Sequence, residues 1–127
     1  MVKYFSPEFF AQLQDNLAND AKWQEGTKGL KTSIKLVSTE QSNVSSYMLK
    51  VEDGKTSISP SEPAAQAEFS FEGAYETWTK VAKGEVDFQS AVLKGLLKFK
   101  GSITKILFYK DRFMRIAELI RSIQVEF

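Results

Sequence analysis

The sequence of 127 residues contains no cysteine and no histidine. The absence of cysteine excludes a disulfide framework and a thiolate metal site, and it is compatible with a reducing compartment. The absence of histidine removes the commonest metal ligand and the usual general base. We therefore predict no catalytic residue, no metal and no cofactor, and we do not expect the chain to be an enzyme.

Two further features are weak or missing. The formal net charge is only +1, so no broad basic field favours nucleic acid as a partner. No apolar run approaches the roughly 20 residues that span a bilayer. The N-terminal stretch MVKYFSPEFF lacks the apolar core of a signal peptide, which makes the cytoplasm the expected location. The length predicts one domain over residues 1–127.

What is present is a clear alternation of helix and strand signals. Ser6-Pro7 predicts a helix start, because serine caps and proline suits the first helical position. Strands are expected over 30–36 and 47–52, separated by a polar loop over 38–46. Asp53-Gly54 predicts a two-residue hairpin, since a type I′ turn needs positive φ at both positions.

Each expected strand has one apolar and one polar face. Phe69 and Phe71 alternate with Glu68 and Glu72, for example, and we expect these two carboxylates to be solvated. This pattern is typical of an antiparallel sheet with one wet side. The predicted fold class is α+β, with a five-stranded, mostly antiparallel sheet that helices cover on one face.

The most informative segment is QSAVLKGLLKFKG, residues 89–101. Its end alternates, which places Leu97 and Phe99 on one strand face and two lysines on the other. Gly101 then ends the strand and Ser102 can cap a helix. The segment resembles the signature of the sterol carrier protein family, in which a strand of alternating Leu/Ile and Lys lies between two glycines. The lead-in VAKGEVDFQSA is similar as well.

The resemblance implies a domain that encloses a hydrophobic small molecule and needs no catalytic group. The implied ligands are fatty acids, fatty acyl-CoA, sterols or other hydrophobic molecules. The candidates for head-group contact are Gln89, Lys94, Lys98 and Lys100, and the alternative for the lysines, which the pattern favours, is a solvated strand face. The cavity is expected to be lined by Phe69, Phe71, Trp78, Phe88, Ala91, Val92, Leu97, Phe99, Ile103, Ile106, Leu107, Phe113, Ile116 and Ile120.

The C-terminal stretch over 102–123 has a wide apolar face and a basic flank, with a break expected near Asp111. It can serve as a core helix, as a lid over the ligand, or as a helix that contacts an anionic membrane surface. Two other functions stay open. One is a filled-core interaction module, including a homodimer, and the other is an accessory domain that presents a hydrophobic substrate to a separate enzyme.

Overall fold

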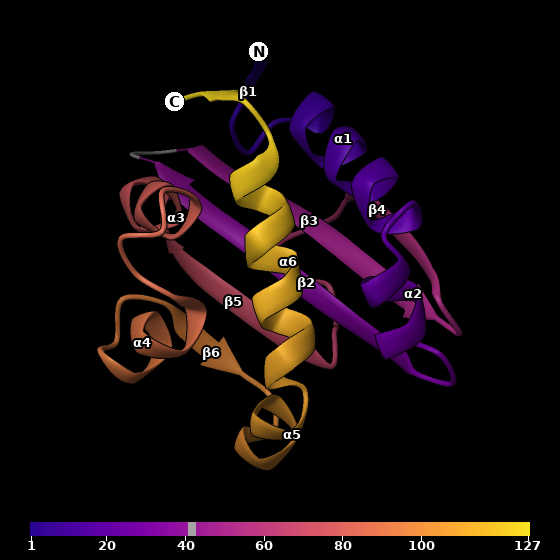
Figure 1. Cartoon of the computed structure of the whole chain (residues 1–127). Coiled ribbons are helices and arrows are strands. Elements are labelled where there is room, and N and C mark those ends of the chain that lie inside the picture. The colour runs from indigo at the N-terminus through magenta and orange to yellow at the C-terminus, as the bar shows by residue number, and fades with distance from the viewer. Residues whose placement is uncertain (41–42) are drawn as a thin grey trace.

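The computed structural model describes residues 1–40 and 43–127, which form six helices and seven strands (Figure 1). The helices are α1 (Pro7–Ala18), α2 (Ala21–Gly26), α3 (Tyr75–Ala82), α4 (Phe88–Leu93), α5 (Ile103–Phe108) and α6 (Lys110–Ser122). The strands are β1 (Val2–Lys3), β2 (Lys31–Glu40), β3 (Asn43–Glu52), β4 (Lys55–Pro60), β5 (Phe69–Ala74), β6 (Lys98–Lys100) and β7 (Val125–Glu126).

Five strands form one sheet in the order β4-β3-β2-β5-β6. The pairs β2–β3, β3–β4 and β5–β6 are antiparallel, whereas β2 and β5 run parallel, with Ile34 opposite Phe69. The parallel pair arises because the chain leaves the edge strand β4 and crosses to the far side of β2. The helices lie on one face of this sheet (Figure 1). The predicted α+β class and the mostly antiparallel sheet are confirmed.

Local signals set the ends of several elements. The hydroxyl of Ser6 accepts a hydrogen bond from the Phe9 amide at 3.2 Å, which caps α1 as expected. Asp53 and Gly54 have φ angles of 47° and 84° and join β3 to β4 in the predicted two-residue hairpin. The loop expected over 38–46 is shorter, because β2 continues to Glu40 and β3 begins at Asn43. Residues 41 and 42 lie outside the described residues.

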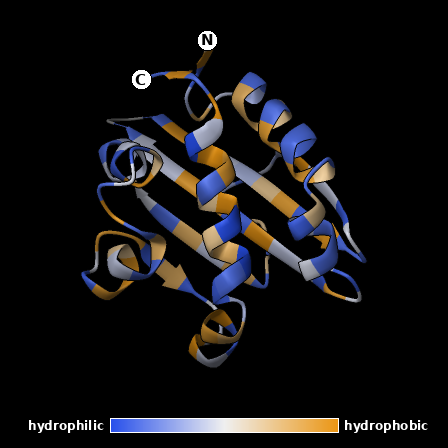
Figure 2. Ribbon diagram, viewed as in Figure 1, coloured by the Kyte–Doolittle hydropathy of each residue, from blue (hydrophilic) through white to orange (hydrophobic). Residues whose placement is uncertain are grey.

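The core lies between the sheet and the helices, and aromatic rings fill much of it. The rings of Phe10 in α1 and Tyr47 in β3 stack with centroids 4.1 Å apart. On the other side, Phe71 of β5 meets Phe113 of α6 at 5.6 Å. Figure 2 shows hydrophobic and hydrophilic residues alternating along the strands, which lets one face pack against the helices.

The opposite face of the sheet is less exposed than the sequence predicted. Lys35 is buried, and its Nζ donates hydrogen bonds to the backbone carbonyl oxygens of Pro63 and, at 2.9 Å, Ala65. Its register partner Met48 is buried too. The expectation of a fully wet face is therefore wrong here, because the crossing segment between β4 and β5 lies against it.

The two ends of the chain meet in a separate two-stranded parallel sheet formed by β1 and β7 (Figure 1). The amide of Tyr4 donates to the carbonyl oxygen of Glu126 at 2.9 Å. Strands of two residues show no periodicity, so the sequence did not predict this pair. The contact holds the C-terminal end of α6 beside the start of the chain.

Candidate functional site

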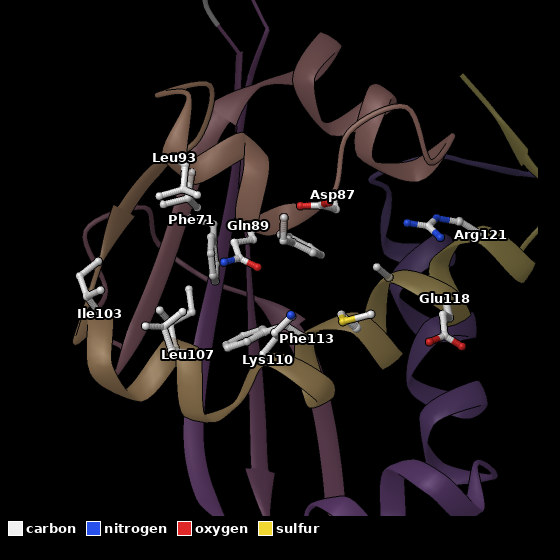
Figure 3. Close-up of a pocket in the computed structure, with 15 residues that line it drawn as sticks. Phe71, Asp87, Gln89, Leu93, Ile103, Leu107, Lys110, Phe113, Glu118 and Arg121 are labelled. Carbon is white, nitrogen blue, oxygen red and sulfur yellow. The ribbon is translucent and has the colours of Figure 1, made fainter.

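A cavity of about 520 Å³ lies between α4, α5 and α6, and Phe71 of β5 contributes to its lining (Figure 3). We call it the α4–α6 groove. Its buried lining side chains are apolar, and they come from the sheet, from α4 and from α6: Phe71, Phe88, Phe113 and Ala117. The other lining residues are Asp87, Gln89, Val92, Leu93, Ile103, Ile106, Leu107, Lys110, Met114, Glu118 and Arg121.

Short capped helices build two walls of the groove. The carboxylate of Asp87 accepts a hydrogen bond from the Ser90 amide at 2.7 Å and so caps α4. Gly95 follows the end of α4 with a φ of 74°. The amides of Leu96 and Leu97 then both donate to the carbonyl oxygen of Ala91. Ser102 then caps α5 by accepting from the Lys105 amide at 3.2 Å, as the sequence predicted.

Gly101 makes the turn from β6 into α5. Its φ is +141°, a conformation that residues with a side chain rarely adopt. A Cβ placed there would lie 2.9 Å from the carbonyl oxygen of Glu68 and 3.0 Å from the ring of Phe69. Glycine is required here because the turn lies directly against β5.

The C-terminal stretch breaks as expected, since α5 ends at Phe108 and α6 starts at Lys110. Tyr109 takes the N-cap position of α6 without a side-chain hydrogen bond, and Asp111 lies in the first turn of that helix. Negative charge there is favourable because it faces the positive end of the helix dipole.

Two arginines attach the side of α6 that faces α2. Arg112 donates to the carbonyl of Gly26 at 2.7 Å, and Arg115 pairs with Asp20.

The two ends of the groove differ in polarity (Figure 3). Leu93, Ile103 and Leu107 surround one end and are 78%, 59% and 55% exposed. Charged side chains surround the other end, namely Asp87, Glu118 and Arg121, and Lys110 lies between the ends. The lining therefore contains two carboxylates and two cations, whose formal charges cancel.

The electrostatics of Asp87 indicate a stable carboxylate. The Ser90 amide holds the pKa of Asp87 below its usual value, and the Arg121 charge acts in the same direction. Glu68, which precedes β5 and lies outside the groove, also has a lowered pKa, caused first by the Thr32 hydroxyl and then by Lys105 at 2.9 Å. Glu72 is exposed, as expected. Glu68 is only partly exposed, and its carboxylate accepts hydrogen bonds from Thr32 and Lys105, so it is not simply solvated.

Half of the residues expected to line the cavity lie in the groove. These are Phe71, Phe88, Val92, Ile103, Ile106, Leu107 and Phe113, together with Gln89 from the expected head-group set. Six others are buried in the core and do not line it, namely Phe69, Trp78, Ala91, Leu97, Ile116 and Ile120. Phe99 is partly buried, and its ring is 5.2 Å from that of Phe71.

The three lysines expected at the head group, Lys94, Lys98 and Lys100, are exposed and do not line the groove. Lys98 and Lys100 flank Phe99 on β6, and strand alternation sends them to the opposite face. The groove instead presents residues that sequence reasoning missed: Asp87, Leu93, Lys110, Met114, Ala117, Glu118 and Arg121. The α6 members of this set recur every three or four residues, a helical spacing that could have identified them.

Comparison with known proteins now assigns the chain. It matches the SCP-2 sterol transfer family over residues 10–113, and it belongs to that family. The predicted resemblance is confirmed. No curated protein matches the chain.

Solved structures show the same fold. A crystal structure of sterol carrier protein 2 is similar with a TM-score of 0.86 and 19% identity, covering 96% of this chain and 100% of that one. A conserved hypothetical protein from Thermus thermophilus reaches 0.85 and 19%, covering 99% and 93%. An inverting sec-alkylsulfatase, Pisa1 from Pseudomonas sp., contains a similar region, with a TM-score of 0.55, 15% identity and coverage of 82% and 15%. Domains of this fold therefore also occur within enzymes.

Among residues 1–40 and 43–127, no helix combines the length and the apolarity that crossing a membrane requires.

Proposed function

We propose that the chain binds one apolar lipid molecule in the α4–α6 groove and carries it without changing it chemically. The observation that carries this proposal is the groove itself, which has an apolar buried lining and three of its four charged side chains at one end. Its volume of about 520 Å³ lies within the range of about 300–1,000 Å³ that is typical of small-molecule sites. Membership of the SCP-2 sterol transfer family supports the same function.

Binding would be a partition between water or membrane and the groove. Each buried methylene contributes about 0.8 kcal/mol, so the roughly fifteen methylenes of a long acyl chain contribute about 12 kcal/mol. Lost translational and conformational freedom offsets several kcal/mol of that gain. We therefore expect affinities in the micromolar range, which correspond to about −8 kcal/mol. No step needs a nucleophile or a general base.

The polarity of the groove indicates how the ligand lies. Its hydrocarbon part would rest on Phe71 and Phe113, because these rings are buried and apolar. Its polar end would face Glu118 and Arg121. Because the lining charges cancel, a hydroxyl or zwitterionic head suits the groove as well as a carboxylate does.

The test is a titration with a fluorescent long-chain fatty acid, combined with native mass spectrometry of the purified protein. The variant Val92→Trp places a large ring in the groove, since Val92 lines it and is only partly buried. The control Val44→Trp makes the same change on β3, where Val44 is 51% exposed and does not line the groove. We expect Val92→Trp to weaken binding at least about tenfold and Val44→Trp to bind normally. Equal binding by both variants and the wild type would place the ligand elsewhere.

An accessory role is the second candidate, because a similar fold occurs within the Pseudomonas sec-alkylsulfatase. In that role the groove would present a hydrophobic substrate to a separate enzyme. Both roles require ligand binding, so the fatty-acid titration alone does not distinguish a carrier from an accessory domain. Transfer to vesicles and turnover by the partner enzyme do. A carrier exchanges its ligand with vesicles by itself, whereas an accessory domain accelerates turnover by its partner enzyme.

A further inference from the structure

Exposed apolar side chains gather at one corner of the molecule. Among the described residues, five of the nine large hydrophobic side chains that are strongly exposed lie between positions 93 and 108. We call them the apolar corner: Leu93, Leu96, Ile103, Leu107 and Phe108. They belong to α4, to α5 and to the turn before β6, which lie together at one side of the sheet (Figures 1 and 2). Large apolar side chains that gather at the surface of neighbouring elements are typical of an interaction site.

The same stretch carries a strong net positive charge. Residues 88–110 contain five lysines and no acidic residue, which gives +5. The whole chain has 17 basic and 16 acidic residues, so the remainder carries −4. The chain is thus nearly neutral in total and strongly polarised, with its basic side at the apolar corner.

Acidic residues in and just before β5 neutralise part of this charge. Glu68 forms an ion pair with Lys105 at 2.9 Å, and Glu72 lies opposite Lys98 in the register of β5 and β6. None of the ion pairs among the described residues involves Lys94, Lys100 or Lys110. These three lysines therefore remain available to an anionic partner.

We propose that the apolar corner docks on the surface of an anionic phospholipid bilayer. Apolar side chains would enter the interface, and the neighbouring lysines would meet lipid phosphates. Leu93, Ile103 and Leu107 belong both to this corner and to the apolar end of the α4–α6 groove. Docking there would open the groove directly to the hydrocarbon layer. This step rests on the proposed carrier function, although binding to a bilayer can be measured without it.

The polarity of the groove agrees with this orientation. Its apolar end would face the bilayer, and its charged end, with Asp87 and Arg121, would face away from the membrane interior. A lipid in the bilayer has the same direction, with its tail inside and its polar group outside. A ligand could therefore move between bilayer and groove without burying its polar group in hydrocarbon, which is costly.

A second copy of the chain is a poorer occupant. A two-fold symmetric contact would place the same basic surface on both sides and so oppose like charges. The apolar side chains also stand on two six-residue helices and a turn, and not along a long groove that could receive a helix. Charge complementarity thus favours an anionic lipid surface.

The experiment is co-sedimentation with vesicles of phosphatidylcholine alone and with vesicles in which phosphatidylglycerol replaces a third of it. We expect the wild type to bind the anionic vesicles at least about tenfold more strongly. The variant Lys94→Glu/Lys100→Glu should lose that preference. The control Lys50→Glu/Lys55→Glu changes the net charge equally on β3 and β4, at the opposite edge of the sheet, and should keep it.

A second variant tests the apolar contribution. Leu96→Ser/Phe108→Ser changes two exposed residues that do not line the groove. It should weaken vesicle binding about tenfold while a water-soluble fluorescent fatty acid still binds in the absence of vesicles. If both lysine variants lose binding equally, or if the serine variant dissociates an oligomer without altering vesicle binding, the docking proposal is overturned. Vesicle binding without fatty-acid binding would instead overturn the carrier function and leave the docking surface supported.

Discussion

The guanidinium group of Arg115 on α6 forms two hydrogen bonds with the carboxylate of Asp20, which caps α2, although 95 positions separate the two residues. The bond from Nε of Arg115 measures 2.9 Å. Asp20 also accepts from the Trp23 amide at 2.8 Å, so one carboxylate caps α2 and fastens α6. Because α6 forms one wall of the α4–α6 groove, this pair helps to fix the position of that wall.

Replacement of Asp20 separates its two roles. Asp20→Ala removes the cap and the ion pair, and we expect a loss of about 1–2 kcal/mol in the free energy of unfolding. Asp20→Asn keeps a capping side chain and should cost less than about 1 kcal/mol. Chemical denaturation of both variants measures the difference. Equal losses would show that the ion pair, and not the cap, dominates.

The same carboxylate predicts a pH dependence. The hydrogen bond from Arg115 holds the pKa of Asp20 below its usual value in the folded chain. A lowered pKa stabilises the fold above the unfolded value of about 3.9, and this stabilisation is lost as the pH falls through the folded value. The difference in unfolding free energy between the wild type and Asp20→Asn should therefore be constant near neutral pH and shrink below about pH 4. A difference that stays constant down to pH 2 would contradict the assignment.

Gly101 is a position at which a small change should destabilise the fold. Gly101→Ala forces a side chain into a positive-φ conformation and against the carbonyl of Glu68, and strain of this kind costs about 1–3 kcal/mol. Gly26→Ala is the matched control, since a Cβ there meets nothing within 4 Å and φ is not positive. Thermal unfolding should show a clear loss for Gly101→Ala and little change for Gly26→Ala.

Two neighbouring positions on α6 distinguish core from groove. Ile116 is 3% exposed and does not line the groove, so Ile116→Asp should destabilise the whole domain by several kcal/mol. Met114 is 50% exposed and lines the groove, so Met114→Asp should leave the fold intact and weaken binding of a long-chain fatty acid about tenfold. Circular dichroism and ligand titration on the pair provide the measurement. Selective loss of binding by Ile116→Asp would instead support α6 as a lid that closes through Ile116.

The sequence could predict the sheet because its signals are local. Asp53-Gly54 determines a hairpin, and the alternation around Phe99 determines a strand, whatever the rest of the chain does. The burial of Lys35 could not be predicted, because it depends on a crossing segment that contacts it from 28 positions away. The role of each apolar residue in α6 could not be predicted either. Its apolar face is wide enough to cover both the core, at Ile116, and the groove, at Met114, and periodicity does not say which stripe faces which.

The charged end of the groove allows a final prediction about ligand choice. Asp87→Asn retains a side chain that can cap α4 but removes one of the two negative charges of the lining. The lining then has an excess of positive charge, with Arg121 nearby, and should bind hexadecanoate about two- to fivefold more strongly. The gain is small because solvent screens the interaction. Binding of hexadecan-1-ol, which carries no charge, should not change.

The matched control is Glu85→Gln, which removes an exposed charge two positions away that does not line the groove, and it should alter neither ligand's affinity. Displacement of a fluorescent fatty acid measures both ligands under the same conditions. A selective gain for hexadecanoate places the carboxylate beside Asp87, at the charged end of the groove. An equal change for both ligands would mean that the substitution acts through the capping of α4 and not through charge, which would contradict the proposed orientation of the ligand.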